Sequence, residues 1–265
     1  MYLAGPGDRR LVADLLDRAP GWTAVVAFGT DAYYTSPCQR VRIANPVESH
    51  YGGWTIAYAE DPLGVPDWIT TFDRHTPAEV TAAFVTALIH GLDSHFTNLP
   101  HDGRHDTARS PAALLAQHGW HALPGIRPHH ALSPDGYAAY QIRSGRIHEY
   151  AELLEPEKST WRISAGPDPV NAPAWQAYFS SHTPAPLITA SAATLTDPAP
   201  VPRTFGTIPD RHHSLVDIQL PSPRPPASHL ATAAADRLAG QETAALPPPA
   251  PSTVPARPAT PRRQR

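Results

Sequence analysis

The stretch WITTFDRHTPA, residues 68–78, returns later in the chain as WQAYFSSHTPA, residues 175–185. In both stretches a phenylalanine follows the tryptophan after four residues, a histidine follows after three more, and Thr-Pro-Ala comes next. A further tryptophan, Trp54 or Trp161, stands fourteen residues before each stretch. Chance is a poor explanation for this shared register, so we interpret the chain as two copies of one domain.

The repeat extends toward the N-terminus of each copy through two shorter motifs. Gly21-Trp22 and Ser36-Pro37 in the first copy correspond to Gly119-Trp120 and Ser133-Pro134 in the second. The interval from Ser-Pro to the next tryptophan is 18 residues in the first copy and 28 in the second. This difference predicts a loop of variable length, where insertions are tolerated.

Local signals predict that each copy opens with a helix. Apolar residues recur at helical spacing over residues 8–18, and Pro20-Gly21 ends that pattern. In the second copy, Ser110 is a typical N-cap and Pro111 suits the first helical position, because its missing N–H costs no hydrogen bond there.

Short runs of aromatic and β-branched residues follow and predict antiparallel strands. In the first copy they span residues 22–28, 32–35, 40–44, 54–59 and 68–72. Ser133-Pro134-Asp135-Gly136 is typical of a tight hairpin turn, and Ser36-Pro37-Cys38-Gln39 is a weaker version of it.

A closing helix is predicted after the last strand of each copy. Thr76 and Glu79 flank Pro77 in the spacing of a capping box, which predicts a helix running to about Gly91. Its counterpart spans roughly residues 184–195. We therefore predict an α+β fold: two tandem repeats, each a small antiparallel sheet flanked by helices in the order of about α-β-β-β-β-α. How the two sheets pack stays open.

Composition divides the chain further. Its 265 residues include 33 prolines, more than one globular domain of this size usually carries. We expect a first repeat over 1–95, a linker over 96–108, a second repeat over 109–196, and a disordered tail rich in proline and alanine over 197–265. The tail is mildly basic, whereas the rest of the chain is mildly acidic.

The Gly-Trp starts, the Ser-Pro-Asp turn and the Trp…Trp-x-x-x-Phe…Thr-Pro-Ala endings together resemble the SPDY family, over about residues 3–195. The resemblance implies a tandem domain of unknown function common in filamentous actinomycetes, a source that the arginine-rich, lysine-poor composition also favours. Cys38 departs from the pattern by replacing the aspartate of the motif in the first copy. The resemblance implies an architecture but no reaction.

The setting we expect is the cytoplasm. A single cysteine, Cys38, excludes an intramolecular disulfide and a cysteine-rich zinc site. The N-terminus has no recognisable secretory signal, and no run of eighteen apolar residues predicts insertion into a membrane.

Candidates for chemistry each have a simpler structural interpretation. The six tryptophans with Phe72 and Phe179 are better explained as core than as a stacking platform for bases. The densest histidine cluster, His101-Asp102-Gly-Arg-His105-Asp106, lacks the frame of a specific metal site. No phosphate-binding loop is present either. From the two observations together we expect no metal and no cofactor.

Single residues lead to the same expectation. His75 and His182 occupy equivalent positions, where they would either form an acid–base pair or pack beside a helix cap. Ser36 and Ser133 lack a nucleophile elbow, and Cys38 is better explained as a small turn residue than as a redox-sensitive thiol. We predict no catalytic residue.

Three classes of function stay open. We favour a non-enzymatic protein-interaction or scaffold module whose partner is another protein. A nucleic-acid-associated protein is the first alternative, although an acidic body repels phosphate. The second alternative is an uncharacterised enzyme with a site between the repeats, built from His75, His182, Asp135 or Glu149.

Overall fold

The computed structural model describes the residues 2–27, 31–46, 52–93, 110–123, 129–146, 148–204 and 206–220. Residues 1–217 form one compact unit and residues 218–265 form another; the first unit contains both repeats. The expected linker over 96–108, with its histidine cluster, lies outside the described residues.

Each repeat begins and ends with a helix and has its strands in between. The elements of the first repeat are, in order, α1 (Arg10–Arg18), β1 (Thr23–Ala27), β2 (Asp31–Thr35), β3 (Val41–Asn45), β4 (Gly53–Tyr58), β5 (Trp68–Asp73) and α2 (Ala78–Asp93). Those of the second are α3 (Pro111–Gln117), β6 (His121–Ala122), β7 (His129–Leu132), β8 (Ala138–Ile142), α4 (Glu149–Leu154), the short 3-10 helix η2 (Pro156–Lys158), β9 (Trp161–Ala165), β10 (Trp175–Phe179) and α5 (Ala185–Thr194).

The predicted α+β class is confirmed. Each repeat has five described strands, one for each run predicted in the first copy and one more than the approximate order α-β-β-β-β-α. The described strands form a single antiparallel sheet in the order β1-β2-β3-β4-β5-β10-β9-β8-β7-β6. The two repeats therefore share one continuous sheet, a question that the sequence left open.

The repeats join where β5 pairs with β10. Thr71 lies opposite Tyr178 in the register, and these two residues hold the same position in their repeats. Phe72 pairs with Ala177 and Thr70 with Phe179. The junction has the pattern of a two-fold dimer interface, in which the same surface is used on both sides.

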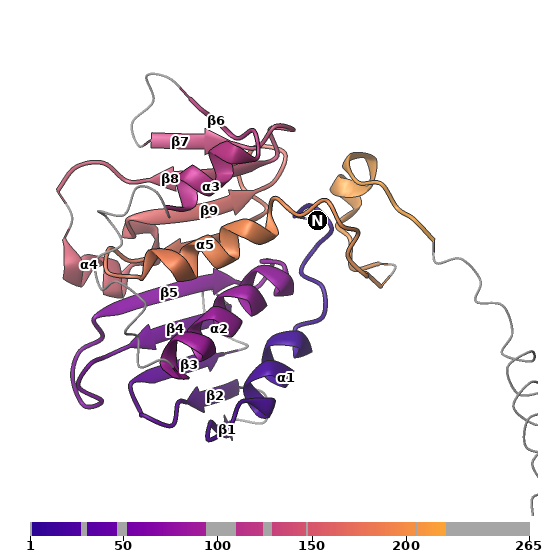
Figure 1. Ribbon diagram of the computed structural model, residues 1–265. Coiled ribbons are helices and arrows are strands. Elements are labelled where there is room, and N and C mark those ends of the chain that lie inside the picture. Colours follow the sequence, from indigo (N-terminus) through magenta and orange to yellow (C-terminus); the bar gives the residue numbers. More distant parts are fainter. Residues whose placement is uncertain are drawn as a thin grey trace, which may run out of the picture. The chain divides into compact units, whose positions relative to one another are not determined.

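Four helices cover one face of the sheet. Figure 1 shows α1, α2, α5 and α3 lying side by side across it, and neighbours in that order are in contact. Ser191 of α5 donates a hydrogen bond to the Val80 carbonyl of α2 at 3.1 Å. Between the sheet and the two central helices, Phe84 of α2 and the strand residues Phe72 and Phe179 are fully buried. The helix layer thus repeats the two-fold arrangement of the sheet.

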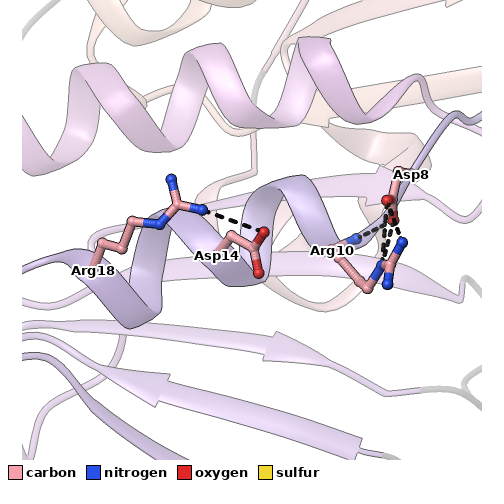
Figure 2. A network of polar contacts seen from close by, with 4 residues as sticks. All are labelled: Asp8, Arg10, Asp14 and Arg18. Carbon is pink, nitrogen blue, oxygen red and sulfur yellow. Dashed lines mark hydrogen bonds and ion pairs between the residues drawn. The ribbon is translucent and has the colours of Figure 1, made fainter. Parts of the chain in front are cut away.

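The start of α1 is stabilised by Asp8, whose Oδ1 accepts the backbone N–H of Arg10 at 3.0 Å. Figure 2 shows the Asp8 carboxylate facing the Arg10 guanidinium, and Asp14 facing Arg18 one turn later. Hydrogen bonds from the Arg10 side chain and backbone lower the pKa of Asp8. All four side chains are exposed, so these ion pairs contribute little to stability.

The other helix starts confirm one prediction and correct another. Ser110 caps α3, because its Oγ accepts the Ala113 N–H at 3.2 Å. The capping box predicted for α2 is wrong, although the helix does begin at Ala78. The hydroxyl of Thr76 donates to Asp73 and to the Gln176 carbonyl across the repeat junction, and Glu79 binds Arg203.

Glu79 is bound by a segment that we expected to be disordered. Arg203 donates to both of its carboxylate oxygens, at 2.6 and 2.9 Å, and the Arg203 side chain is only 5% exposed. Farther on, His212 is buried within a 3-10 helix, η3 (Asp210–Leu215). The ordered part of the chain therefore extends to Asp217 and not to residue 196, because buried contacts fix it; residues from 221 onward lie outside the described ones.

These contacts enclose the N-terminal segment. Arg203 Nε donates to the Ala4 carbonyl at 3.0 Å, and His212 Nδ1 lies 2.9 Å from the Leu3 carbonyl. On the side of the second repeat, Trp175 Nε1 donates to the Tyr2 carbonyl at 2.8 Å, and the Tyr2 hydroxyl donates to Asp135. The N-terminal segment thus links the first repeat, the second repeat and the segment after α5.

Candidate functional site

The ten-residue difference between the copies corresponds to a short helix. In the second repeat α4 and η2 lie between β8 and β9, whereas the equivalent strands of the first repeat, β3 and β4, are separated by a shorter interval, residues 46–52. α4 contacts β5 of the first repeat (Figure 1). The insertion therefore breaks the two-fold symmetry at a point where the repeats meet.

A buried carboxylate holds α4 in place. Glu152 is only 2% exposed, and its two oxygens accept the Thr160 hydroxyl and the Ser181 backbone N–H, the latter at 3.0 Å. Thr160 directly precedes β9, and Ser181 lies between β10 and α5. A buried charge is tolerated only where such hydrogen bonds replace water. Glu152 thus fixes the inserted helix to the sheet.

A pocket of about 220 Å³ lies between α4 and the first repeat. Its walls come from three segments: the β4–β5 loop, the helix α4 and the β10–α5 connection. The lining residues are Val65, Pro66 and Asp67; Glu149, Tyr150, Glu152 and Leu153; and Ser180, Ser181 and His182. Both repeats are needed to form it.

Two exposed apolar side chains line the pocket, Tyr150 from α4 and Val65 from the β4–β5 loop, and each has a further exposed apolar side chain close to it in the sequence. Tyr150 is 68% exposed and Leu154, one helical turn later on the same face of α4, is 79% exposed. On the opposite wall, Val65 is 65% exposed and the nearby Leu63 is 93% exposed. Large apolar side chains grouped around a pocket are typical of an interaction site.

The charges of the pocket are mostly negative. Asp67 and Glu149 contribute exposed carboxylates, and none of the lining residues is a lysine or an arginine. His182 Nε2 lies 3.7 Å from Glu149 Oε1, so a protonated imidazole can offset one of these charges. The pocket is therefore suited to a cationic group that lies beside an apolar one.

The same residues do not form a nucleophile–base pair. The Ser180 hydroxyl accepts the Ile69 N–H at 3.0 Å and lies 3.4 Å from the Thr183 hydroxyl. These two contacts give Ser180 a structural role. In the described part of the chain, His182 makes no hydrogen bond to a hydroxyl group. Covalent catalysis needs that contact, since the base must reach the proton it removes.

Two of the four residues considered for an enzyme site come together, and two do not. His182 and Glu149 both line the pocket, whereas Asp135 binds Tyr2 elsewhere. His75 cannot pair with His182, because the two follow the ends of antiparallel strands, β5 and β10, and so lie at opposite ends of that strand pair. The interpretation as an acid–base pair is therefore wrong.

Asp135 has a structural role in the hairpin turn. It accepts the Ser133 hydroxyl at 2.6 Å and the Tyr137 N–H at 3.1 Å. Burial acts to raise the pKa of Asp135, but the hydrogen bonds from Ser133, Tyr2 and Tyr137 outweigh it, so that pKa is lowered. In the first repeat Cys38 replaces this aspartate; it is exposed and lies 3.3 Å from the Ser36 hydroxyl.

The remaining candidates belong to the framework. Ser36 and Ser133 are buried and accept backbone N–H groups within their turns, from Val41 and Ala138. Five of the six tryptophans are buried, which confirms the core interpretation for Trp54, Trp68, Trp120, Trp161 and Trp175. The sixth, Trp22, is partly buried against the same core.

Neither a metal centre nor a membrane-spanning helix is found among the residues that the structure describes. No group of three or more histidine, cysteine, aspartate or glutamate side chains is placed to hold a metal ion. None of the described helices is both long enough and apolar enough to cross a bilayer.

Sequence reasoning missed most of the pocket. Glu152, Tyr150 and Val65 carry no motif, and they are brought together only by the fold. One signal pointed to the place: the longer Ser-Pro to Trp interval of the second copy, which contains α4.

The fold and the pocket define a class of protein: a duplicated α+β domain whose copies share one sheet and whose asymmetric junction forms a pocket. The SPDY family model, described as a domain of unknown function (DUF317), matches residues 35–92 and 132–201. Both repeats thus carry a region that belongs to the SPDY family, and the two matched regions are consistent with tandem copies. No curated protein and no solved structure matches the chain significantly.

Proposed function

We propose that this protein is a non-enzymatic interaction module that binds a segment of another protein in the pocket between its repeats. The observation that carries the proposal is that two different repeats expose apolar side chains, Tyr150 and Val65, in the lining of one pocket with carboxylates in its walls. Exposed apolar side chains of this kind do not stabilise a monomer, whereas burying them against a partner contributes favourable free energy to binding.

The chemistry of the pocket indicates the kind of segment. Tyr150 and Val65 offer apolar contact area, and aromatic residues are frequent anchors at interfaces. Asp67 and Glu149 would attract an arginine or lysine of the partner. The expected ligand is therefore a short peptide segment with an apolar side chain next to a basic one.

The negative charge of the pocket also bears on the two alternative functions, a nucleic-acid-associated protein and an enzyme. Carboxylates in a pocket that no described lysine or arginine lines repel phosphate, which argues against nucleic acid at this pocket. The enzyme alternative gains no support from His182 and Glu149, because a reacting hydroxyl or thiol beside the imidazole is missing among the described contacts.

We further propose a cytoplasmic, actinobacterial setting. The exposed thiol of Cys38 suits a reducing compartment, and the arginine-rich composition suits a GC-rich genome. Within this proposal the repeats occupy 1–95 and 109–196, and the proline-rich tail would recruit a second partner.

Selection from a random peptide library against the full chain, followed by titration of the selected peptides, tests the pocket directly. We expect sequences with Arg or Lys beside an apolar residue, and binding that Tyr150→Ala and Val65→Lys each weaken about tenfold or more. Val25→Lys is the matched control, since Val25 is 61% exposed and lies on β1, outside the pocket.

Peptides that bind both pocket variants as tightly as the unchanged chain would overturn the proposal. A parallel titration with duplex DNA addresses the first alternative: salt-sensitive binding of DNA that survives Val65→Lys, in the absence of peptide selection, would favour a nucleic-acid-associated protein.

A further inference from the structure

The two ends of the sheet differ in length and protection. At one end β6 is only two residues long, and short edge strands offer little to pair with. At the other end β1 spans five residues, and no described strand pairs with its outer side. An unpaired edge of this length presents backbone N–H and C=O groups to any extended chain that approaches.

The composition of β1 gives it none of the usual protection. The strand reads Thr-Ala-Val-Val-Ala, with no charged residue and no proline. Val25 and Val26 are 61% and 68% exposed, on opposite faces of the sheet. Tyr33 lies directly opposite Val25 on β2 and is 39% exposed, so the apolar surface continues into the sheet. Such an edge is expected to be covered in the working protein.

The chain already joins two copies of this domain by pairing edge strands. At the β5–β10 junction the strands are antiparallel, and Thr71 meets its own counterpart, Tyr178, at the centre of the register. Antiparallel pairing about a two-fold axis is therefore a contact that this domain is known to make within one chain.

We propose that β1 pairs with β1 of a second copy of this protein, antiparallel and about a two-fold axis near Val25. In that register Val25 faces Val25 of the second copy, with Tyr33 of each copy beside it. A two-fold axis places the residue on the axis opposite itself and brings the same strand to both sides, so a charge in β1 would lie near its own copy, which is destabilising. The uncharged sequence of β1 meets this requirement, which is why the proposal commits to a second copy.

The dimer should be reversible. Pairing through one strand and its neighbouring side chains buries less surface than the roughly 1,200–2,000 Å² of a standard stable interface. The fraction of dimer is therefore expected to rise with protein concentration. This proposal does not depend on the peptide pocket.

Analytical ultracentrifugation of the full chain over a range of concentrations tests it, with Val25→Lys, Val25→Glu, their equimolar mixture, and Val65→Lys as matched control. We expect a monomer–dimer equilibrium for the unchanged chain and for Val65→Lys, and monomers for each Val25 variant alone. The equimolar mixture should restore the dimer, because opposite charges then face one another across the axis.

A chain that stays monomeric at every concentration, a dimer that persists in Val25→Lys, or a mixture that stays monomeric while both variants keep the circular dichroism spectrum of the unchanged chain would each overturn the proposal. The two proposals fail separately: Val65→Lys should lose peptide and keep the dimer, and Val25→Lys should lose the dimer and keep peptide.

Discussion

Phe72 and Phe179 hold the same position in the two repeats, and they meet edge to face with ring centroids 5.7 Å apart and planes at 90°. Phe84 of α2 packs against both, at 5.5 Å from Phe72 and 6.0 Å from Phe179. The hydrophobic core of one repeat is therefore continuous with that of the other.

This shared core predicts that the repeats unfold together. Phe179→Ala should lower the free energy of unfolding by about 3–5 kcal/mol, because it removes a fully buried ring and leaves a cavity. Urea unfolding followed by circular dichroism and by tryptophan fluorescence should give one coincident transition before and after the change. Leu154→Ala, an exposed position, is the control; two separated transitions in the unchanged chain would contradict the prediction.

The ion pair between Arg203 and Glu79 should stabilise the first unit of the chain. Arg203→Ala leaves a mostly buried carboxylate without its bidentate partner, and the expected loss is about 2–4 kcal/mol in the free energy of unfolding. Arg203→Lys should recover only part of it, since an ammonium cannot reproduce the paired geometry.

Chemical denaturation measures the loss, with Arg10→Ala as the matched arginine control. Arg10 also pairs with an aspartate but is 83% exposed, so its removal should leave stability nearly unchanged. Equal effects of the two alanine variants would show that burial of the Arg203 pair is unimportant.

The two Ser-Pro turns offer a prediction about backbone strain. Gln39 has φ of 60°, in the left-handed region, where its counterpart in the second repeat is Gly136 at φ of 76°. Gln39→Gly should raise stability by about 0.5–1 kcal/mol, because glycine adopts this conformation without steric cost.

Gly136→Ala is the reciprocal change and should lower stability by about 1 kcal/mol. A Cβ at that position meets nothing within 4 Å, so the loss would report conformation alone. Thermal unfolding of both variants against the unchanged chain measures the effect, and changes of the same sign in both would contradict it.

Two buried histidines predict how stability depends on pH. Burial lowers the pKa of His212 and of His130 below the ordinary value of 6.5, and a nearby arginine, Arg211 or Arg162, adds to the effect. His212 Nδ1 donates to the Leu3 carbonyl, so Nε2, which is buried without a partner, would have to take up the added proton.

The direction of this pH dependence follows from the number of protons that the folded and the unfolded chain each bind. Below pH 6.5 the unfolded chain binds more protons than the folded one, so stability present at neutral pH is lost as the pH falls through 6.5 toward the lowered folded values. His212→Gln and His130→Gln should each flatten this dependence, and the double variant more than either. Urea unfolding across about pH 8 to 5 measures it; slopes unchanged in the double variant would contradict the prediction.

Several elements could be predicted from residues alone because their signals are local. The α3 start depends on Ser110 and Pro111, the hairpin turn depends on Ser133 to Gly136, and burial of the tryptophans follows from their size and chemistry. The repeat itself is visible because equal spacing along two segments reports equal structure.

Other features depend on contacts between residues far apart in the chain. Glu79 has the spacing of a capping box, yet it binds Arg203, because a buried guanidinium offers two charged hydrogen bonds where a cap offers one weaker contact. The segment after α5 contains prolines and lacks periodicity, but the buried side chains of Arg203 and His212 fix its described residues.

The sequence by itself therefore determined the α+β class, the duplication and most helix and strand positions, since these follow from short-range pattern and turn chemistry. Only the tertiary structure decided that the copies share one sheet through β5 and β10, that an inserted helix opens a pocket beside Tyr150 and Val65, and that no described strand pairs with the outer side of β1. Strand partners and pockets arise from the pairing of distant backbone segments, and a pattern along one strand carries no information about the strand beside it.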